Sequence, residues 1–512
     1  MTRTLRNLAR LLAIARILAR HNSLFLLERL QVAAPVLMLA RLFSRKAEGR
    51  PGQRLATALQ EAGPSFIKLG QALSTRSDLL GEEFATDLSA LQDRLPPFPG
   101  DQAIKIIERE FGKPLDQLFS GFDTTPVAAA SIAQVHFAET LDGREVAVKV
   151  LRPGIEQAFA RDLELFSWVA ELVEAARPEF RRLRPVASVA TLADTVKLEM
   201  DLRFEAAAAA ELGENFKDDP DFTVPKVDWV LTGLRVLTTE RVYGVPMDDV
   251  EAIRGFGLNP TAVLEKSSAA FFQQVYRDGF FHADLHPGNM FVRQDGGLAV
   301  VDFGIMGRLD RTTRRHLGEM LLAFLSRDYR RVAEVHFEAG WIGPEQSVDT
   351  FTQACRSIAE PILDLPQNEI SIARLLGQLF SITEKFDMET QPQLLLLQKT
   401  MLIAEGTGRT LDPEANMWFL ARPLIEDLMR QTLGPEARIV DAVADFAVAL
   451  RRLPSLLENL EKGVAELAGG GLKLHPETIR ALRGGKKTLG LGPITLIATA
   501  AVLVSLLAVI LD

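Results

Sequence analysis

The sequence has a single cysteine, Cys355, among its 512 residues. One thiol, expected to be buried, excludes an intramolecular disulfide and a thiolate-bound zinc, and it suits a reducing compartment. An excess of basic residues is also lacking, because 58 Lys and Arg stand against 67 Asp and Glu, for a net charge of -9. A nucleic-acid-binding protein needs cations that neutralise phosphates, so no nucleic-acid partner is expected.

Acidic residues are missing from the N-terminus, where the first is Glu28. Leucines and isoleucines recur at helical spacing between Arg3, Arg6, Arg10, Arg16 and Arg20. Such a basic amphipathic helix lies on an anionic membrane, docks on a protein surface, or is an ordinary surface helix with solvated arginines. The pattern leaves these alternatives open. A secretory signal is not expected, because no continuous apolar core with a cleavage site follows.

Charge is also missing from residues 488–511, a stretch of 24 residues. At about 1.5 Å per residue, a helix of this length crosses a hydrocarbon core of roughly 30 Å. Basic residues at 480, 483, 486 and 487 precede it, which places that side in the cytoplasm. The sequence therefore predicts a single C-terminal transmembrane helix, in preference to a buried core helix, with the preceding chain in the cytoplasm.

Internal repeats are absent, and the order of patterns indicates an α+β protein. Strand patterns run from about Phe122 through HFAET and EVAVKVL, with a hairpin turn at 141–143. Helical patterns cover about 155–216, two further strands joined by a Thr-Gly turn are expected within 224–242, and helices dominate after 261. Helices, a small β-rich lobe and a larger α-rich lobe together predict a two-lobed domain.

The stretch 282–304, HADLHPGNMFVRQDGGLAVVDFG, gathers polar residues around a short turn. A polar surface loop followed by a hairpin would explain it. The spacing is also that of a kinase catalytic loop, in which Asp284 would orient or deprotonate a nucleophile. Asn289 and Asp302 would supply the oxygen ligands that Mg²⁺ prefers. The combined spacing favours a magnesium–nucleotide site.

Lys149 lies in the middle of the strand pattern VAVKV. It would either point into water or reach nucleotide phosphates, and the kinase-like motif downstream favours the phosphates. Glu205, within a helical pattern, is then the expected ion-pair partner that holds Lys149 in place.

Two standard kinase features are missing. A glycine-rich loop would place glycines where this chain has Ala128, Ala130 and Ala133. Alanine cannot adopt positive φ cheaply, so the loop should hold a nucleotide differently. No Ala-Pro-Glu closes an activation segment after Gly304, which indicates that the platform for a protein substrate is absent.

Lys68 and Gln71, in KLGQ, lie one helical turn apart and share a face. On their own they would be an exposed polar face. Taken with the motifs above, from about residue 55 to 330, the chain resembles the UbiB family of atypical kinase-like proteins, in which KLGQ is the KxGQ signature. The family's alanine-rich loop corresponds to 128–131, and its ExD pair to Glu199 and Asp201. The usual glycine before Gln134 is Ala133 here, which puts in doubt how closely the loop approaches phosphates.

This resemblance implies a two-lobed protein-kinase-like fold in which the KxGQ helices cover ground that a peptide substrate would need. Together with the patterns above, the expected parts are a basic helical segment 1–60, membrane-associated or docked, a KxGQ extension 61–112, an N-lobe 113–245, a C-lobe core 246–330, a helical region 331–487 and the transmembrane helix 488–511.

The resemblance further implies ATP and Mg²⁺ as cofactors and an ATPase that supports ubiquinone biosynthesis, rather than a protein kinase acting in trans. Asp284 and Lys149 take the catalytic positions, and Asn289 and Asp302 those of metal ligands. The positions implied for nucleotide binding are Ala128, Ala129, Ala130, Ser131, Lys149, Glu205, Lys68, Gln71, Glu199 and Asp201.

Implied partners are anionic membrane lipid, quinone precursors and other proteins of ubiquinone biosynthesis at a bacterial inner membrane; homodimerisation is left open. A small-molecule or lipid phosphotransferase and a nucleotide-binding scaffold without turnover remain alternatives. An iron-dependent hydroxylation, with His282 and His286 as ligands beside Asp284, is disfavoured because these residues align with the kinase catalytic loop.

Overall fold

The computed structural model describes residues 3–25, 34–44, 48–74, 95–176, 185–361 and 392–414, with isolated residues at 84, 87–88, 91, 382, 385–386, 388, 423 and 426. The chain divides into two compact units, Met1–Gly434 and Pro435–Asp512, and all described residues belong to the first.

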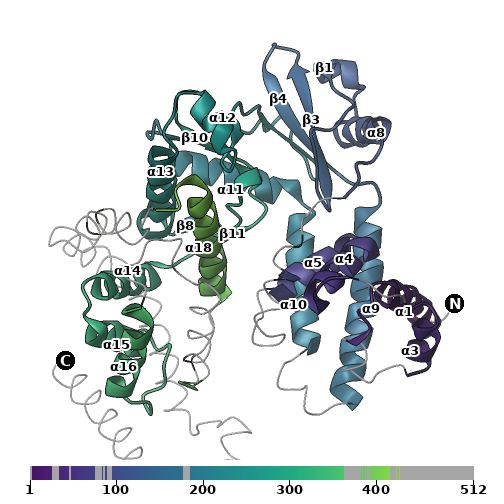
Figure 1. Cartoon of the computed structure of the whole chain (residues 1–512). Coiled ribbons are helices and arrows are strands. Elements are labelled where there is room, and N and C mark those ends of the chain that lie inside the picture. The colour runs from purple at the N-terminus through teal and green to yellow at the C-terminus, as the bar shows by residue number, and fades with distance from the viewer. Residues whose placement is uncertain are drawn as a thin grey trace, which may run out of the picture. The chain divides into compact units, whose positions relative to one another are not determined.

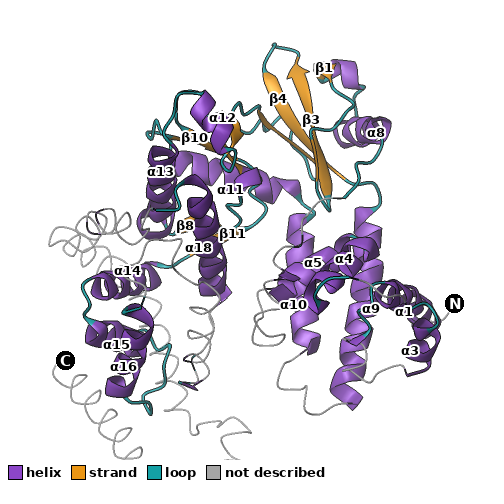
Figure 2. Ribbon diagram, viewed as in Figure 1, coloured by secondary structure: helices purple, strands orange, loops and turns teal. Residues whose placement is uncertain are grey.

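A five-stranded sheet forms the β-rich lobe (Figures 1 and 2). Its strand order is β1-β3-β4-β6, and the short β2 pairs with β3. The bounds are β1 Phe119–Phe122, β2 Ala128–Ala129, β3 Ala133–Thr140, β4 Glu145–Leu151 and β6 Val236–Glu240. Helix α8 (Gly100–Phe111) packs Ala103, Ile106 and Ile107 on this sheet, against Val146, Val148 and Val150 of β4 among others.

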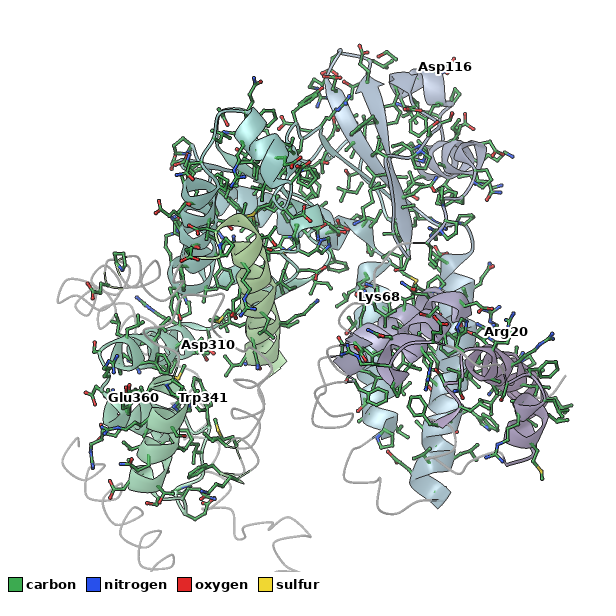
Figure 3. All side chains as sticks on the ribbon, viewed as in Figure 1. Arg20, Lys68, Asp116, Asp310, Trp341 and Glu360 are labelled. Atoms are coloured by element: carbon green, nitrogen blue, oxygen red, sulfur yellow. The ribbon has the colours of Figure 1, made fainter. Side chains whose placement is uncertain are left out.

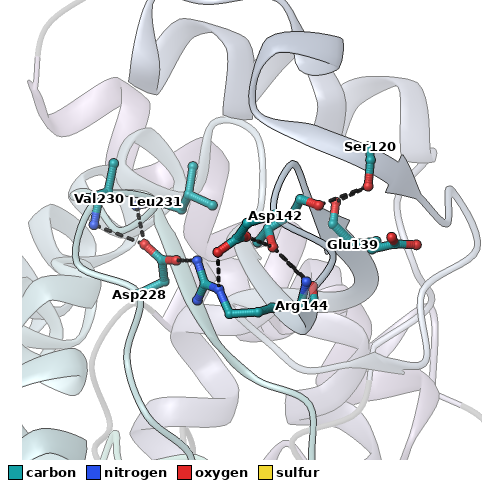
Figure 4. Close-up of polar contacts among 8 residues, drawn as sticks. Ser120, Glu139, Asp142, Arg144, Asp228, Val230 and Leu231 are labelled. Carbon is teal, nitrogen blue, oxygen red and sulfur yellow. Dashed lines mark hydrogen bonds and ion pairs between the residues drawn. The ribbon is translucent and has the colours of Figure 1, made fainter.

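The hairpin expected around residues 141–143 is confirmed, since β3 pairs antiparallel with β4 and Gly143 has a φ of +82°. The expected strand before the Thr-Gly turn is wrong: Val227 makes only an isolated bridge to Thr239. The carboxylate of Asp228 accepts hydrogen bonds from the backbone N–H groups of Val230 and Leu231, each at 3.1 Å (Figure 4). This turn withdraws the backbone from a ladder.

The N-terminal helices form a separate core with two long helices of the kinase-like region. They are α1 (Arg3–Arg20), α3 (Ala34–Arg41), α4 (Pro51–Ala62) and α5 (Pro64–Ser74), packed on α9 (Ile155–Ala176) and α10 (Pro185–Glu199). Leu11, Ile14 and Leu18 of α1 are buried there. Arg10 also bonds Asp162 of α9 at 2.8 Å, so α1 docks its apolar face on the protein.

The α-rich lobe is built around the largest hydrophobic core. It contains a four-stranded sheet of order β5-β10-β9-β7 and a two-stranded sheet of β11 and β8. Its strands are β5 Phe222–Thr223, β7 Val245–Pro246, β8 Phe280–His282, β9 Met290–Val292, β10 Leu298–Val300 and β11 Met306–Arg308. Its helical elements are α11 Leu202–Asn215, α12 Val250–Gly255, α13 Pro260–Phe272, the π-helical η3 Gln273–Asp278 and the short η4 Pro287–Asn289.

Three further helices follow β11, namely α14 (Arg311–Leu325), α15 (Tyr329–Glu338) and α16 (Val348–Ala359). They share a core in which Cys355 is buried. Helix α18 (Pro392–Leu411) returns to the main lobe, where it contacts α13 and β11 (Figure 1).

Membrane spanning was expected only of residues 488–511, which lie outside the described residues. Among the helices that the structure describes, none combines the length and the hydropathy that crossing a membrane requires.

Candidate active site

Lys149 stands at the centre of the site, on β4, where its backbone pairs with Val135 and Leu237 of the neighbouring strands. Its ammonium lies 2.7 Å from Oε1 of Glu205 and 2.8 Å from Oδ1 of Asp302. The expected ion pair with Glu205 is therefore present, and Asp302 is drawn to the same cation.

Glu205 is delivered by α11, which begins where the Asp201 carboxylate accepts a hydrogen bond from the backbone N–H of Arg203. Burial, with the nearby Asp302 charge, raises the pKa of Glu205 to about 7 although Lys149 opposes this. Burial works against the charge on Lys149 as well, but Asp302 and Glu205 outweigh it and raise the lysine pKa. One lysine thus serves two carboxylates, and Glu205 is the one that holds a proton more readily.

Asp302 follows β10 with a φ of +63°, a left-handed conformation that is uncommon for a residue other than glycine. Its side chain is 43% exposed. Desolvation works to raise the pKa of Asp302, but the charge and hydrogen bond of Lys149, with a smaller contribution from the charge of Lys68, hold it below the usual range. The residue is therefore an anion aimed at Lys149, in a strained backbone conformation of the kind that gathers at functional sites.

His282 joins the loop of Asp284 to the strand that precedes Asp302. Its Nε2 donates to the carbonyl of Val301 at 3.1 Å, and its Nδ1 accepts from the backbone N–H of Asp284 at 3.1 Å. Burial lowers the pKa of His282 despite the neighbouring carbonyl and carboxylates, which favours this neutral form. Both ring nitrogens are therefore engaged in hydrogen bonds, and neither is left to bind iron in the disfavoured role of His282 as an iron ligand.

Asn289 is tied to the same loop. Its side-chain Nδ2 donates to the backbone carbonyl of Asp284 at 3.1 Å, and its backbone carbonyl accepts from the N–H of Val301 at 2.9 Å. An amide whose nitrogen is engaged in this way presents its oxygen as the ligand atom. Asp284, Asn289 and Asp302 are thus held in one hydrogen-bonded frame.

The alanine-rich loop is tied down by backbone bonds. Ala128 and Ala129 form β2, and the N–H of Ala130 donates to the carbonyl of Ala133 at 2.8 Å. Arg152 bonds the carbonyl of Ala130 at 2.8 Å. Ser131 is fully buried, and its hydroxyl has no hydrogen-bond partner within the described structure.

The KxGQ and ExD residues meet in part. Lys68, on α5 (Figure 3), lies 2.8 Å from Glu199 at the end of α10. Asp201 instead binds the guanidinium of Arg203 at 2.7 Å, which lowers the aspartate pKa. The Gln71 side-chain oxygen is buried without a hydrogen-bond partner among the described residues. An orphan acceptor of this kind is a place where the donor of a bound ligand would fit.

Two features of the site went unrecognised in the sequence. Gln134, fully buried, binds both the N–H and the carbonyl of Phe98, at 3.0 and 3.1 Å, and its Nε2 lies 2.8 Å from Nε2 of His136. His136 Nδ1 donates to the carbonyl of Asp123 at 2.8 Å. Gln134 thus holds the segment around Phe98 against β3. The alternation of polar and apolar residues along β3 is the sequence feature that could have indicated this contact.

The second is Lys399, whose ammonium lies 2.9 Å from Oδ1 of Asp284 although the residues are 115 positions apart. No motif surrounds this lysine in LQKTM, so the sequence offered no signal for it.

These residues suit magnesium and a nucleotide. Asn289 and Asp302 would each supply one oxygen to the metal. Mg²⁺ commonly takes one or two protein ligands, while phosphates and water complete its octahedron. Lys149 offers a fixed cation for phosphates. Within the described ranges no group of three or more His, Cys, Asp or Glu residues forms a site that could hold a metal ion.

Comparison with known families gives two matches. Residues 90–336 match the ABC1 atypical kinase-like domain, and residues 355–416 match the UbiB helical domain. The first contains Lys149, Glu205, Asp284, Asn289 and Asp302, and the second contains Lys399.

Curated relatives are similar over most of the chain. A protein of Marinobacter nauticus named "Probable protein kinase UbiB" is 44% identical over 82% of this chain and 78% of its own length. Its namesake in Vibrio parahaemolyticus is 41% identical over 92% of this chain and 89% of its own length. A solved structure, the Rv3197–erythromycin complex from Mycobacterium tuberculosis, is 26% identical with a TM-score of 0.51, over 73% of this chain and 95% of that one.

Proposed function

The chain belongs to the UbiB family of atypical kinase-like proteins, and we propose that it is a membrane-anchored, magnesium-dependent ATPase that supports ubiquinone biosynthesis. The observation that carries the proposal is the frame joining Lys149, Glu205 and Asp302 to Asp284 and Asn289.

Each residue of the frame has a proposed task. Lys149, held by Glu205, binds nucleotide phosphates, and Asn289 and Asp302 offer oxygens to the metal. Magnesium, when bound, neutralises charge on the phosphates. Asp284 orients the attacking oxygen and accepts its proton. His282 keeps Asp284 and the strand before Asp302 in register.

The acceptor is proposed to be water or a small molecule rather than a protein. Helix α14 already begins at Arg311, with Asp310 as its N-cap, so the chain leaves little length for an activation segment after Gly304. Lys68 and Glu199 add a salt bridge from the KxGQ helix. The charge of Lys68 also contributes to the low pKa of Asp302, which indicates that this helix lies near the site.

Anionic lipid is the proposed membrane partner, and α3 supports it. Met38, Leu39, Leu42 and Phe43 are exposed in and just after this helix, Leu42 to 79%. Arg16 lies 4.4 Å over the ring of Phe43. Residues 29–47 contain three arginines and one lysine but no acid, a charge that complements anionic head groups. Quinone precursors, which share the lipid phase, are the proposed substrates or cargo.

Phosphate release tests the proposal. Purified protein would receive magnesium and ATP with and without anionic lipid vesicles and a phenolic quinone-precursor analogue, beside Asp302→Asn. We expect the wild type to release phosphate at a rate that lipid or phenol stimulates. We expect Asp302→Asn neither to release phosphate nor to bind ATP in a magnesium-dependent manner. Val230→Ser, at an exposed loop position, is the matched control and should behave as the wild type.

The alternatives give other results. Phosphorylated lipid or phenol without free phosphate would identify a phosphotransferase. ATP binding without turnover under every condition would identify a scaffold. Tight magnesium–ATP binding by Asp302→Asn would overturn the metal assignment.

A further inference from the structure

Asp284 lies in a loop that provides no permanent positive charge. The segment from His282 to Asn289, HADLHPGN, has neither lysine nor arginine. Its second histidine, His286, has Nε2 at 3.9 Å from Oδ2 of Asp284, while its Nδ1 accepts from the N–H of Gly288. The loop therefore leaves the orientation of the carboxylate weakly determined.

Lys399 provides the missing cation from a distant part of the chain. Its ammonium donates to Oδ1 of Asp284 at 2.9 Å, and the two side chains are 31% and 27% exposed. A partly buried, charge-assisted hydrogen bond fixes a side chain more firmly than the same contact would in open solvent.

The position of Lys399 does not depend on this ion pair. Leu397 and Leu411 of α18 are buried in the main core, and Thr261 Oγ1 donates to Asp412 Oδ2 at 2.8 Å just beyond the end of the helix. Helix α18 also contacts α13 and β11 (Figure 1). The lysine is therefore presented to Asp284 by a helix that packing holds in place.

We propose that Lys399 is a positioning residue of the active site, through which the UbiB helical domain completes the kinase-like domain. By holding Oδ1, it turns Oδ2 of Asp284 toward the attacking oxygen. The kinase-like region 90–336 alone would then lack a component of its own catalytic machinery. This inference rests on the proposed ATPase function.

Turnover and nucleotide affinity separate this role from a merely structural one. Lys399→Met should lower kcat by up to about 100-fold, the effect of a misplaced catalytic group, while the affinity for magnesium–ATP stays within about twofold. Lys399→Arg, which restores the charge, should recover part of kcat. Lys266→Met is the matched control, because Lys266 pairs with Asp221 at 2.7 Å with a similar exposure of 33%; it should leave kcat unchanged.

A second measurement does not depend on turnover. Asp284→Asn, Lys399→Met and the double variant form a cycle in the free energy of unfolding, in which contacting residues are non-additive. We expect the double variant to be more stable than the sum of the single effects predicts. Additive effects, an unchanged kcat in Lys399→Met, or a loss of ATP affinity as large as the loss of kcat would each overturn the proposal.

The two failures are distinguishable. Turnover by the wild type that Lys399→Met retains would refute this inference alone. A wild type that hydrolyses no ATP under any condition tested would refute the proposed function and, with it, the role of Lys399.

Discussion

At the scale of single residues, the site is organised by the sharing of hydrogen-bonding groups. Lys149 holds two carboxylates, and His282 uses both ring nitrogens to hold two backbone segments. Such side chains have little freedom to move without breaking a partner's bond, which favours a fixed geometry before any ligand arrives. Changes to single atoms should therefore alter binding or stability in predictable directions.

Ala130 is the residue at which loop stiffness can be tested. Its N–H and carbonyl are both bonded, and no residue from 128 to 131 has positive φ. Ala130→Gly widens the accessible backbone conformations, and it therefore raises the free energy needed to order this loop by about 0.5–1 kcal/mol. The ratio of ATP to ADP affinity should therefore change by roughly two- to fivefold, measured by calorimetric titration. Ala147→Gly, on β4, is the control, and an unchanged ratio in Ala130→Gly would refute the restraint.

His136 gives the stability a pH dependence. Burial lowers its pKa, and the hydrogen bond to Asp123 compensates only in part. The unfolded chain, with a histidine pKa of about 6.5, therefore binds the proton first as the pH falls. The free energy of unfolding should be independent of His136 above about pH 6.5 and decline below it, by at most about 1.4 kcal/mol per pH unit.

His136→Gln removes this titration while keeping a donor and an acceptor. Urea unfolding between pH 7.5 and 5.5 should show a shallower decline for the variant than for the wild type. Equal slopes would mean that His136 is protonated in the folded protein at the lower pH.

At the scale of elements, sequence patterns predicted the secondary structure that short-range interactions determine. The β3–β4 hairpin and the lysine strand were read from alternation and a glycine turn. The strand expected near residue 227 failed because one carboxylate, Asp228, captures two backbone N–H groups, and Arg144 at 2.8 Å holds that carboxylate. Amphipathicity identified α1 but could not choose its partner, since a buried protein surface and a membrane demand the same apolar face.

Helix α3 is the element for which a membrane contact is predicted. Met38→Ser with Leu42→Ser removes two of the most exposed apolar side chains in and just after this helix and should weaken binding to anionic vesicles. Transfer of apolar side chains into the interface drives such binding. Co-sedimentation would best use a chain ending at Gly434, the end of the first compact unit. Trp229→Ser with Val230→Ser, similarly exposed, is the control; equal binding by both pairs would contradict a role for α3.

At the scale of the whole molecule, the contacts that complete the site join distant segments. Motif spacing placed Asp284, Asn289 and Asp302 together because they lie within about one hairpin. The pairing of Lys399 with Asp284 spans 115 residues. The sequence around a lysine in a helix does not indicate which surface that lysine will contact. Such long-range partners follow from packing of the complete core, which periodicity does not specify.

The largest-scale prediction concerns the C-terminal segment and stays a prediction from the sequence. A chain ending at Gly434 should unfold cooperatively and hydrolyse ATP, since it keeps the compact unit that holds the site. It should leave the membrane fraction in an alkaline carbonate wash that the full chain resists. The physical reason is that 24 uncharged residues can cross the bilayer, whereas an interfacial contact is reversible.

A full-length chain with Ala500→Lys and Val504→Lys separates spanning from length. Each lysine near the centre of a spanning helix costs about 2.5–3.5 kcal/mol on insertion, so this variant should wash off the membrane as the shortened chain does. Retention of the double-lysine variant in the washed pellet would show that residues 488–511 do not anchor the protein. Loss of the unmodified full chain in the same wash would lead to the same conclusion, and α3 would then be the main membrane contact.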